Sequence, residues 1–154
     1  MRIIDLFSGV GGLTFGFYYR KYKDHFVRNR KNQFVFANEY NPLAAKAYSE
    51  NYPDIPMKNC DIKSLKESDI KEWIGSEPVD LMIGGPPCQS FSTVGQRNYD
   101  EKAQLYTEYL RVLKIARPKM FLFENVRGIL SMREIFYKRD AAGNILYELK
   151  DVEG

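Results

Sequence analysis

Cys88 is the residue of this sequence whose surroundings most favour chemistry. It lies in the segment Gly84-Gly85-Pro86-Pro87-Cys88-Gln89-Ser90, directly after the apolar run 79–83. The two glycines let the backbone turn sharply and approach a ligand, and the two prolines stiffen the loop. An arbitrary cysteine is more often a buried structural residue. Core packing requires neither the glycines nor the prolines, so the pattern favours a nucleophilic thiol.

Glu124 is a second candidate reactive group, and it follows the apolar run 120–123. A free cysteine has a pKa of about 8.5, so little thiolate is present near neutrality, and attack on carbon needs an activated electrophile. A carboxyl in an apolar, closed pocket stays protonated and donates to a ring nitrogen. Cys88 and Glu124 together predict nucleophilic addition with acid assistance on one heterocycle.

Short apolar runs alternate with helical patterns along the chain. This alternation predicts an α/β fold, with a doubly wound, mostly parallel sheet. We expect helices over 13–19, 42–51, 64–74, where Ser64 and Glu67 fit a capping box, and 105–116. We expect strands at 2–6, 34–37, 57–60, 79–83 and 120–123. Parallel sheets bind ligands at the carboxyl ends of their strands, and the distinctive residues at these ends are Gly9 to Gly12, Glu39, Asp61, Cys88 and Glu124.

The loop after the first strand, Phe7 to Gly12, suits a nucleotide or amino-acid ligand. Its run Gly-Val-Gly-Gly-Leu-Thr-Phe-Gly does not match the dinucleotide fingerprint, so phosphate binding is not its obvious use. Asp5 and Ser8 flank the glycines and suit an amino-acid head group equally well. Glu39 ends the second strand, where ribose hydroxyls are usually bound. Asp61 by itself is typical of an ordinary turn.

Residues 18–32 are rich in Lys and Arg, with Tyr and Phe interleaved. We interpret this stretch as a solvated amphipathic helix followed by a polar connector, and a nucleic-acid contact surface is the alternative. The net charge of +3 permits a polyanionic partner without requiring one.

The composition limits the class of protein. The 154 residues support one domain with a core, and no apolar run approaches the length that spans a bilayer. Two cysteines without a CxxC pair and without a secretory leader predict a reducing cytoplasm. His25 is the only histidine, and no metal site is expected.

Three blocks of the sequence closely resemble the cytosine-5 DNA methyltransferases, over residues 2 to about 130. They are Asp5-Leu-Phe-Ser-Gly-Val-Gly-Gly12, Gly85-Pro-Pro-Cys-Gln-Ser-Phe-Ser92 and Glu124-Asn-Val126. The resemblance implies that Cys88 adds to C6 of a cytosine flipped out of double-stranded DNA, that Glu124 engages N3, and that C5 takes the methyl group. It further implies that Gln89 contacts the backbone of the flipped nucleotide and that Asn125 orders the neighbouring loop.

The resemblance also implies S-adenosyl-L-methionine as cofactor. The positions that match the family's cofactor contacts are Phe7, Ser8, Gly9, Gly11, Gly12, Glu39, Tyr40, Asp61, Ile62, Pro86 and Leu105. A bacterial restriction–modification system is the commonest setting for so compact an arrangement.

The sequence departs from the family after residue 130. The family's arginine block, target recognition domain and C-terminal segment are absent, so we interpret 1–154 as a partial catalytic domain. Its sheet would be incomplete at the C-terminal end, with an edge that a complementary chain could cover. A truncated or engineered piece and one subunit of a split enzyme both stay open. The alternative activities are a tRNA cytosine-5 methyltransferase, a silent cofactor-binding module that needs a partner chain and, more distantly, a dehydrogenase.

Overall fold

The computed structural model describes residues 1–87, 105–126, 133–139 and 145–151, the last two ranges by their backbone alone. The chain divides into two compact units, one of residues 1–86 with 105–124 and one of residues 87–104 with 125–154. Each unit is described by itself.

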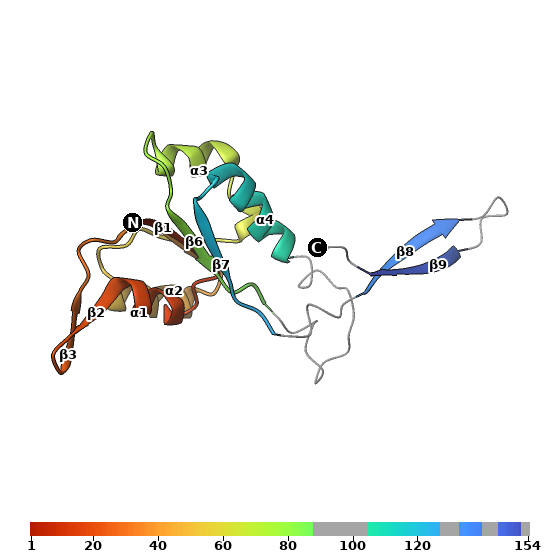
Figure 1. Cartoon of the computed structure of the whole chain (residues 1–154). Coiled ribbons are helices and arrows are strands. Elements are labelled where there is room, and N and C mark those ends of the chain that lie inside the picture. Colours follow the sequence, from red (N-terminus) through yellow and green to blue (C-terminus); the bar gives the residue numbers. More distant parts are fainter. Residues whose placement is uncertain (88–104, 127–132, 140–144, 152–154) are drawn as a thin grey trace. The chain divides into compact units, whose positions relative to one another are not determined.

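A five-stranded parallel sheet forms the centre of the first unit (Figure 1). The strand order is β5-β4-β1-β6-β7, and every neighbouring pair is parallel. The chain therefore winds from β1 to one edge and then to the other, which confirms the predicted doubly wound sheet. The strands are β1 (Arg2–Leu6), β4 (Gln33–Glu39), β5 (Met57–Asn59), β6 (Leu81–Gly84) and β7 (Met120–Phe123).

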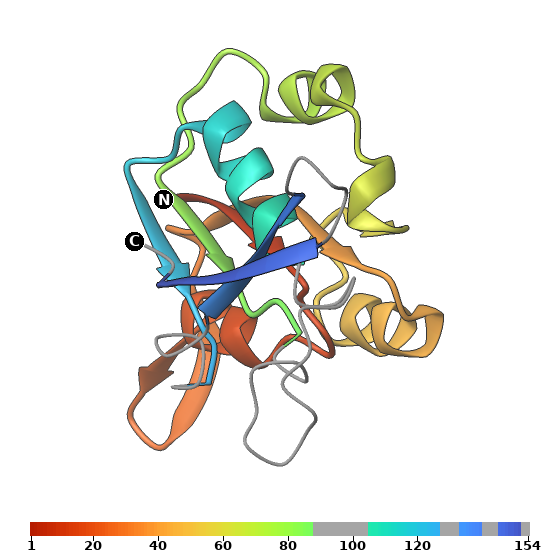
Figure 2. The ribbon, with the colours of Figure 1, turned by 90° about the vertical axis from the view of Figure 1, so that its right-hand side faces the viewer.

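Helices cover both faces of this sheet, as Figures 1 and 2 show. Neighbouring strand residues point to opposite faces, so Ile3 packs beside α1 (Gly12–Tyr18) and α2 (Pro42–Asn51), whereas Ile4 packs beside α3 (Glu67–Ile74) and α4 (Leu105–Ala116). Both isoleucines are fully buried. Burial on both faces explains why these strands read as continuous apolar runs.

The helix start at Asn41 agrees with the sequence prediction. The Asn41 Oδ1 accepts hydrogen bonds from the N–H groups of Leu43 and Ala44 at 2.9 and 3.2 Å, and Pro42 follows as the first helical residue. The capping box predicted for α3 is wrong. Ser64 belongs to a 3₁₀ turn, η1 (Ile62–Ser64), and its hydroxyl donates to the Asp61 carbonyl, so it does not cap the helix.

The helix predicted within residues 18–32 is also wrong. After α1 ends at Tyr18, β2 (Tyr19–Tyr22) and β3 (His25–Arg28) form an antiparallel hairpin. Tyr19 and Phe26 lie on one face of the hairpin and pack against the Phe15 ring, and Lys23 takes the positive φ of 53° that the tight turn requires.

The second unit contains one described antiparallel pair, β8 (Arg133–Arg139) with β9 (Ile145–Asp151). The segment Asp140-Ala-Ala-Gly-Asn144 is typical of a turn between two β segments, and these two strands agree with it. Residues 140–144 themselves lie outside the described residues. Among the described helices, none is long and apolar enough to cross a membrane.

Candidate active site

Three residues of the loop after β1 have a left-handed backbone conformation, which glycine adopts most easily, and one of them is Phe7 with φ of 55°. Gly9 has φ of 56° and Gly11 has φ of 95°. A Cβ on Gly11 would lie 2.1 Å from the Tyr52 ring, and the Tyr52 hydroxyl donates to the Gly11 carbonyl at 2.8 Å. Tyr52 therefore fixes the loop from below and leaves no room for a side chain at Gly11.

Glu39 connects this loop to the end of β4. One carboxylate oxygen accepts from the Gly9 N–H at 2.8 Å, and the other accepts from the Asn41 N–H at 2.7 Å. Both oxygens therefore hold backbone groups at the carboxyl edge of the sheet. The Glu39 side chain lies where the sequence predicted a contact with a sugar hydroxyl, beside the glycine loop.

A buried polar network lies directly beneath the loop. The Thr14 hydroxyl donates to one Asp5 carboxyl oxygen, and the hydroxyls of Thr14 and Tyr48 lie 2.9 Å apart. The other Asp5 oxygen and the Ser8 hydroxyl are buried, and neither has a hydrogen-bond partner among the described residues. Burial, opposed by the Thr14 hydrogen bond and supported by the Glu39 charge, raises the pKa of Asp5 from 3.8 to about 7. These orphaned atoms are suited to a polar ligand that enters the loop.

Glu124 lies at the same edge of the sheet, just past the end of β7. Its N–H donates to the Gly84 carbonyl at 2.9 Å, and a Cβ on Gly85 would lie 2.8 Å from its carboxylate. Gly84 is equally confined, because a Cβ there would lie 2.6 Å from the Leu6 carbonyl oxygen. Gly84 and Gly85 therefore allow a close approach, because a side chain at Gly84 would meet the β1 backbone and one at Gly85 would meet Glu124. Glu124 is exposed, so the closed apolar pocket expected around it is not seen in the described residues.

The remaining predicted cofactor positions surround the ends of β4, β5 and β6. The Asp61 carboxylate accepts from the Lys63 N–H at 2.9 Å as the cap of η1, and Ile62 beside it is buried. Tyr40 is 73% exposed, so its ring is free to cover a planar group. Pro86 is buried and Leu105 is half-buried against the core.

Three of the predicted site residues lie outside the first unit or outside the described residues. Cys88 and Gln89 lie outside the described residues, and Asn125, whose Oδ1 accepts from the Val126 N–H at 2.8 Å, belongs to the second unit. Within the described part of the chain, no group of three or more His, Cys, Asp or Glu side chains is arranged to hold a metal ion.

Comparison with known proteins gives this arrangement a family. The family model for C-5 cytosine-specific DNA methylase matches residues 1–152. The chain belongs to the C-5 cytosine-specific DNA methylase family. The Type II methyltransferase M.AgeI of Thalassovita gelatinovora is 42% identical over 135 residues, which are 86% of this chain and 29% of that protein.

Solved structures of methyltransferases share the fold of this methylase. A protein described as a DNA modification methyltransferase, encoded within a prophage (E. coli), is 34% identical with a TM-score of 0.66, covering 84% of this chain and 33% of that one. A DNMT2 variant of Spodoptera frugiperda is 25% identical with a TM-score of 0.60, covering 85% and 37% respectively. The chain thus spans about a third of the length of each of these three relatives.

Several residues that shape the site were missed by sequence reasoning. No motif of the sequence marks Thr14, Tyr48 or Tyr52, and their hydroxyls reach the loop only because α1 and α2 lie against the same face of the sheet. Asp5 lies within the apolar run 2–6, and this position in a buried strand indicates that its carboxyl is buried.

Proposed function

We propose that this chain is the cofactor- and nucleophile-bearing part of an enzyme that methylates C5 of cytosine in double-stranded DNA. The observation that carries the proposal is the carboxyl edge of the sheet, where Glu39 holds the glycine loop and Glu124 lies against Gly85. The family and the Type II names of its relatives support DNA as substrate, in a bacterial restriction–modification setting in the cytoplasm.

The loop also fits S-adenosyl-L-methionine, which would supply the methyl group when bound. An ammonium group is the natural partner for the orphaned Asp5 oxygen, and the buried Ser8 hydroxyl offers a donor to a carboxylate. Glu39 lies where sugar hydroxyls would be held, with Tyr40 and the Asp61 region beside it. These contacts go beyond what the family assignment gives. They are tested by measuring how the Asp5→Asn variant binds S-adenosyl-L-methionine.

The proposed chemistry uses two side chains. The Cys88 thiolate adds to C6 while Glu124 donates a hydrogen bond or proton to N3, so the ring accepts the electron pair and C5 becomes nucleophilic. After C5 takes the methyl group, a base removes the C5 proton and the thiolate leaves C6. Flipping the base is required because C5 and C6 are stacked within the duplex, and it costs a few kcal/mol.

The test is the intact mass of the chain after incubation with S-adenosyl-L-methionine and a duplex that carries 5-fluorocytosine, which traps the C6 adduct. We expect an adduct on wild type when a downstream fragment of a family member is added, and none on Cys88→Ser. Unchanged capture by Cys88→Ser would remove Cys88 from the mechanism. Methyl transfer to tRNA but not to duplex DNA would favour the alternative activity, that of a tRNA cytosine-5 methyltransferase.

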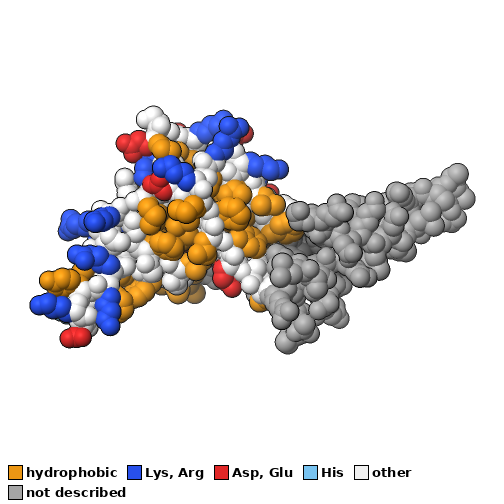
Figure 3. Space-filling model, in the orientation of Figure 1, with side chains coloured by type: hydrophobic (Ala, Val, Ile, Leu, Met, Phe, Trp, Pro, Cys, Tyr) orange, Lys and Arg blue, Asp and Glu red, His pale blue; other side chains and the backbone are white. Residues whose placement is uncertain are grey.

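We further propose that a complementary polypeptide covers the β7 edge. Met120 and Phe121 are 55% and 60% exposed there, and hydrophobic side chains gather over this strand in Figure 3. Because the chain spans 29% of M.AgeI and β7 has one strand neighbour among the described residues, a later segment of the catalytic domain, on this or another chain, is the fitting cover. An adduct that forms only with the added downstream fragment would support this, and full activity of the chain alone would contradict it.

A further inference from the structure

Positive charge is concentrated in one stretch of the chain. Residues 18–32 contain six Lys and Arg residues against one Asp, a surplus of five, whereas the whole chain has a net charge of +3. All other residues together are therefore net negative. In the structure this stretch is the β2–β3 hairpin and the segment that leads into β4, and Figure 3 shows blue side chains on that end of the first unit.

The hairpin has one covered and one open face. Residues directly opposite each other in an antiparallel pair share a face, so Arg20 and Val27 lie together, as do Tyr22 and His25. The other face packs on α1, because the Phe15 ring lies 5.1 Å from the rings of Tyr19 and Phe26. A hollow of about 830 Å³ lies on the open side, lined by Arg20, Tyr22, Val27, Arg28, Asn29, Arg30 and Lys31.

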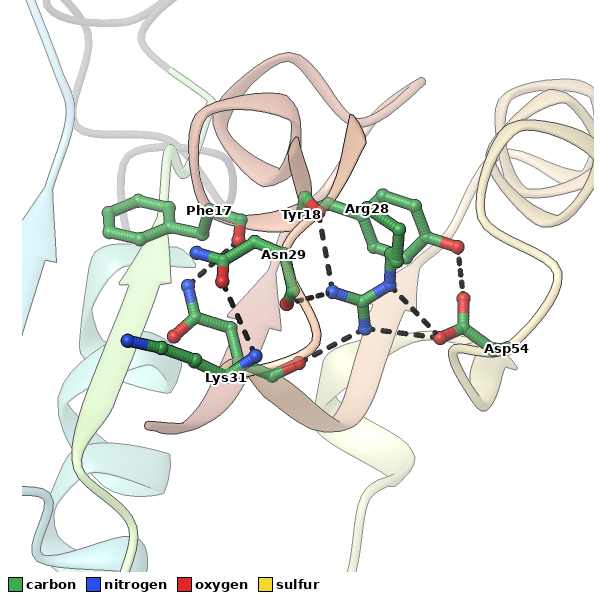
Figure 4. A network of polar contacts seen from close by, with 7 residues as sticks. Phe17, Tyr18, Arg28, Asn29, Lys31 and Asp54 are labelled. Atoms are coloured by element: carbon green, nitrogen blue, oxygen red, sulfur yellow. Dashed lines mark hydrogen bonds and ion pairs between the residues drawn. The ribbon is translucent and has the colours of Figure 1, made fainter. Parts of the chain in front are cut away.

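Arg28 fixes the hairpin to the rest of the unit (Figure 4). Its guanidinium donates to the Asp54 carboxylate at 3.1 and 3.3 Å and to the carbonyls of Tyr18 and Asn32 at 3.3 and 3.0 Å. It also lies 3.9 Å from the centre of the Tyr18 ring. Arg28 is therefore occupied in the fold, and it gives the hollow a rigid wall.

Three other cations line the hollow without a carboxylate partner, and the Arg20 guanidinium lies 5.7 Å from the centre of the Tyr22 ring. Arg20, Arg30 and Lys31 are exposed, and none lies within 4 Å of a carboxylate in the described part of the chain. A second hollow of about 770 Å³ adjoins the first through Arg28 and Arg30 and extends to Arg2, where β1 begins. The basic surface thus lies toward the amino ends of the strands, opposite Glu39 and Glu124 in the same unit.

We propose that this surface, made by Arg20, Arg30 and Lys31, binds the phosphate backbone of double-stranded DNA without regard to sequence. Unpaired cations on a rigid, open face suit a regular array of phosphates, and such contacts position a protein on DNA without reading its bases. The inference rests on the proposed function in taking DNA as the partner. Because the surface lies away from the carboxyl edge, it would hold the protein on DNA while leaving the base-binding edge clear.

The test is fluorescence anisotropy of a labelled 30-base-pair duplex titrated with the chain at salt concentrations from 50 to 200 mM. The variant Arg20→Gln/Arg30→Gln/Lys31→Gln removes the three cations. The matched control Lys46→Gln/Lys63→Gln/Lys114→Gln removes three exposed lysines from other elements and leaves the same net charge. Circular dichroism checks that both variants keep the wild-type fold.

We expect the hairpin variant to bind at least about tenfold more weakly at 100 mM salt, with a slope of log K against log salt shallower by about two to three. The control variant stays near wild type. Equal losses in both variants, or no loss in the hairpin variant, would overturn the proposal. Competition by polyglutamate as strong as by unlabelled duplex would also overturn it, since an acidic protein surface would then be the better partner.

This outcome is separable from the proposed function. Cys88→Ser should bind the duplex with wild-type affinity and salt dependence while losing the covalent adduct. The hairpin variant should form the adduct at saturating DNA. A variant that loses the adduct but keeps salt-dependent binding therefore tests the proposed function. A variant that loses salt-dependent binding but keeps the adduct tests the basic surface.

Discussion

Asp5 is the described residue whose charge state matters most for the fold. Its carboxyl is buried beneath the glycine loop, where one oxygen accepts from the Thr14 hydroxyl and the other has no partner in the described part of the chain. The raised pKa of about 7 means that the folded chain resists ionising a group that the unfolded chain ionises above about 4. The folding free energy therefore becomes less favourable as pH rises from about 4 to about 7, by at most roughly 4 kcal/mol.

Replacing Asp5 by Asn should remove most of this pH dependence. The free energy of unfolding, measured with urea at pH 5 and pH 8, should fall between these values by a few kcal/mol in wild type, and by less than about 1 kcal/mol in Asp5→Asn. Asp24→Asn, at the exposed hairpin turn, serves as the control and should behave as wild type. An unchanged pH dependence in Asp5→Asn would assign the effect to another group.

Glu39 has a different task, because both of its carboxylate oxygens accept backbone hydrogen bonds. Glu39→Gln keeps one acceptor and replaces the other by a donor that faces an N–H group. We expect S-adenosyl-L-methionine to bind about tenfold more weakly by calorimetry, with about 1–2 kcal/mol of lost stability. Glu50→Gln, on the exposed side of α2, is the matched control and should change neither quantity. Wild-type cofactor affinity in Glu39→Gln would contradict the assigned role.

At the scale of elements, the β1 loop and α1 depend on the contact between Gly11 and Tyr52, which joins the start of α1 to the end of α2. The loop can turn there only because no side chain stands between the backbone and the Tyr52 ring. A second glycine, Gly16, lies inside α1 with no atom near its missing Cβ and without a positive φ. A side chain is therefore expected to lower the stability of the fold at Gly11 and to raise it at Gly16.

Gly11→Ala should destabilise the chain by about 1–3 kcal/mol, because the methyl group meets the Tyr52 ring and the left-handed φ is strained. Gly16→Ala should instead stabilise it by about 0.5–1 kcal/mol, because alanine favours the helix. Thermal unfolding of both variants distinguishes these effects. Equal stabilities would mean that the Tyr52 ring moves aside freely.

At the scale of the whole molecule, the first unit carries a parallel sheet whose last strand is open. Met120 and Leu122 point to the face that α1 and α2 cover elsewhere, and they are 55% and 38% exposed. An apolar strand at a sheet edge is a site for association with another chain. The described sheet is therefore poised to take up a further segment at β7.

Replacing Met120 and Leu122 together by Gln should lower self-association of the chain at tens of micromolar, measured by sedimentation velocity. The melting temperature should change little, because these side chains are already partly in water. Leu43→Gln, which alters an isolated leucine that is 78% exposed, should leave self-association unchanged. Self-association that persists in the double variant would place the contact elsewhere.

Much of the architecture was set by local patterns. Five apolar runs produced the five strands of the sheet, Asn41 with Pro42 started α2, and Gly75 ended α3 with a φ of 68°. The family followed from three short blocks of residues. The hairpin over 19–28 was missed because aromatic and basic residues fit a helix and a strand equally, and contact with Phe15 decided between them.

What the sequence by itself determined is the five strands of the parallel sheet with the helices between them, the methylase family and which residue types follow the strand ends. Only the tertiary structure decided how those residues are held. The Glu39 carboxylate accepts a hydrogen bond from Gly9, 30 residues away in the chain, and the Tyr52 hydroxyl donates to Gly11, 41 residues away. Asp5 is buried because α1 and α2 pack over the end of β1. Such contacts depend on distances between elements that pack together, and residue spacing along a chain does not contain those distances.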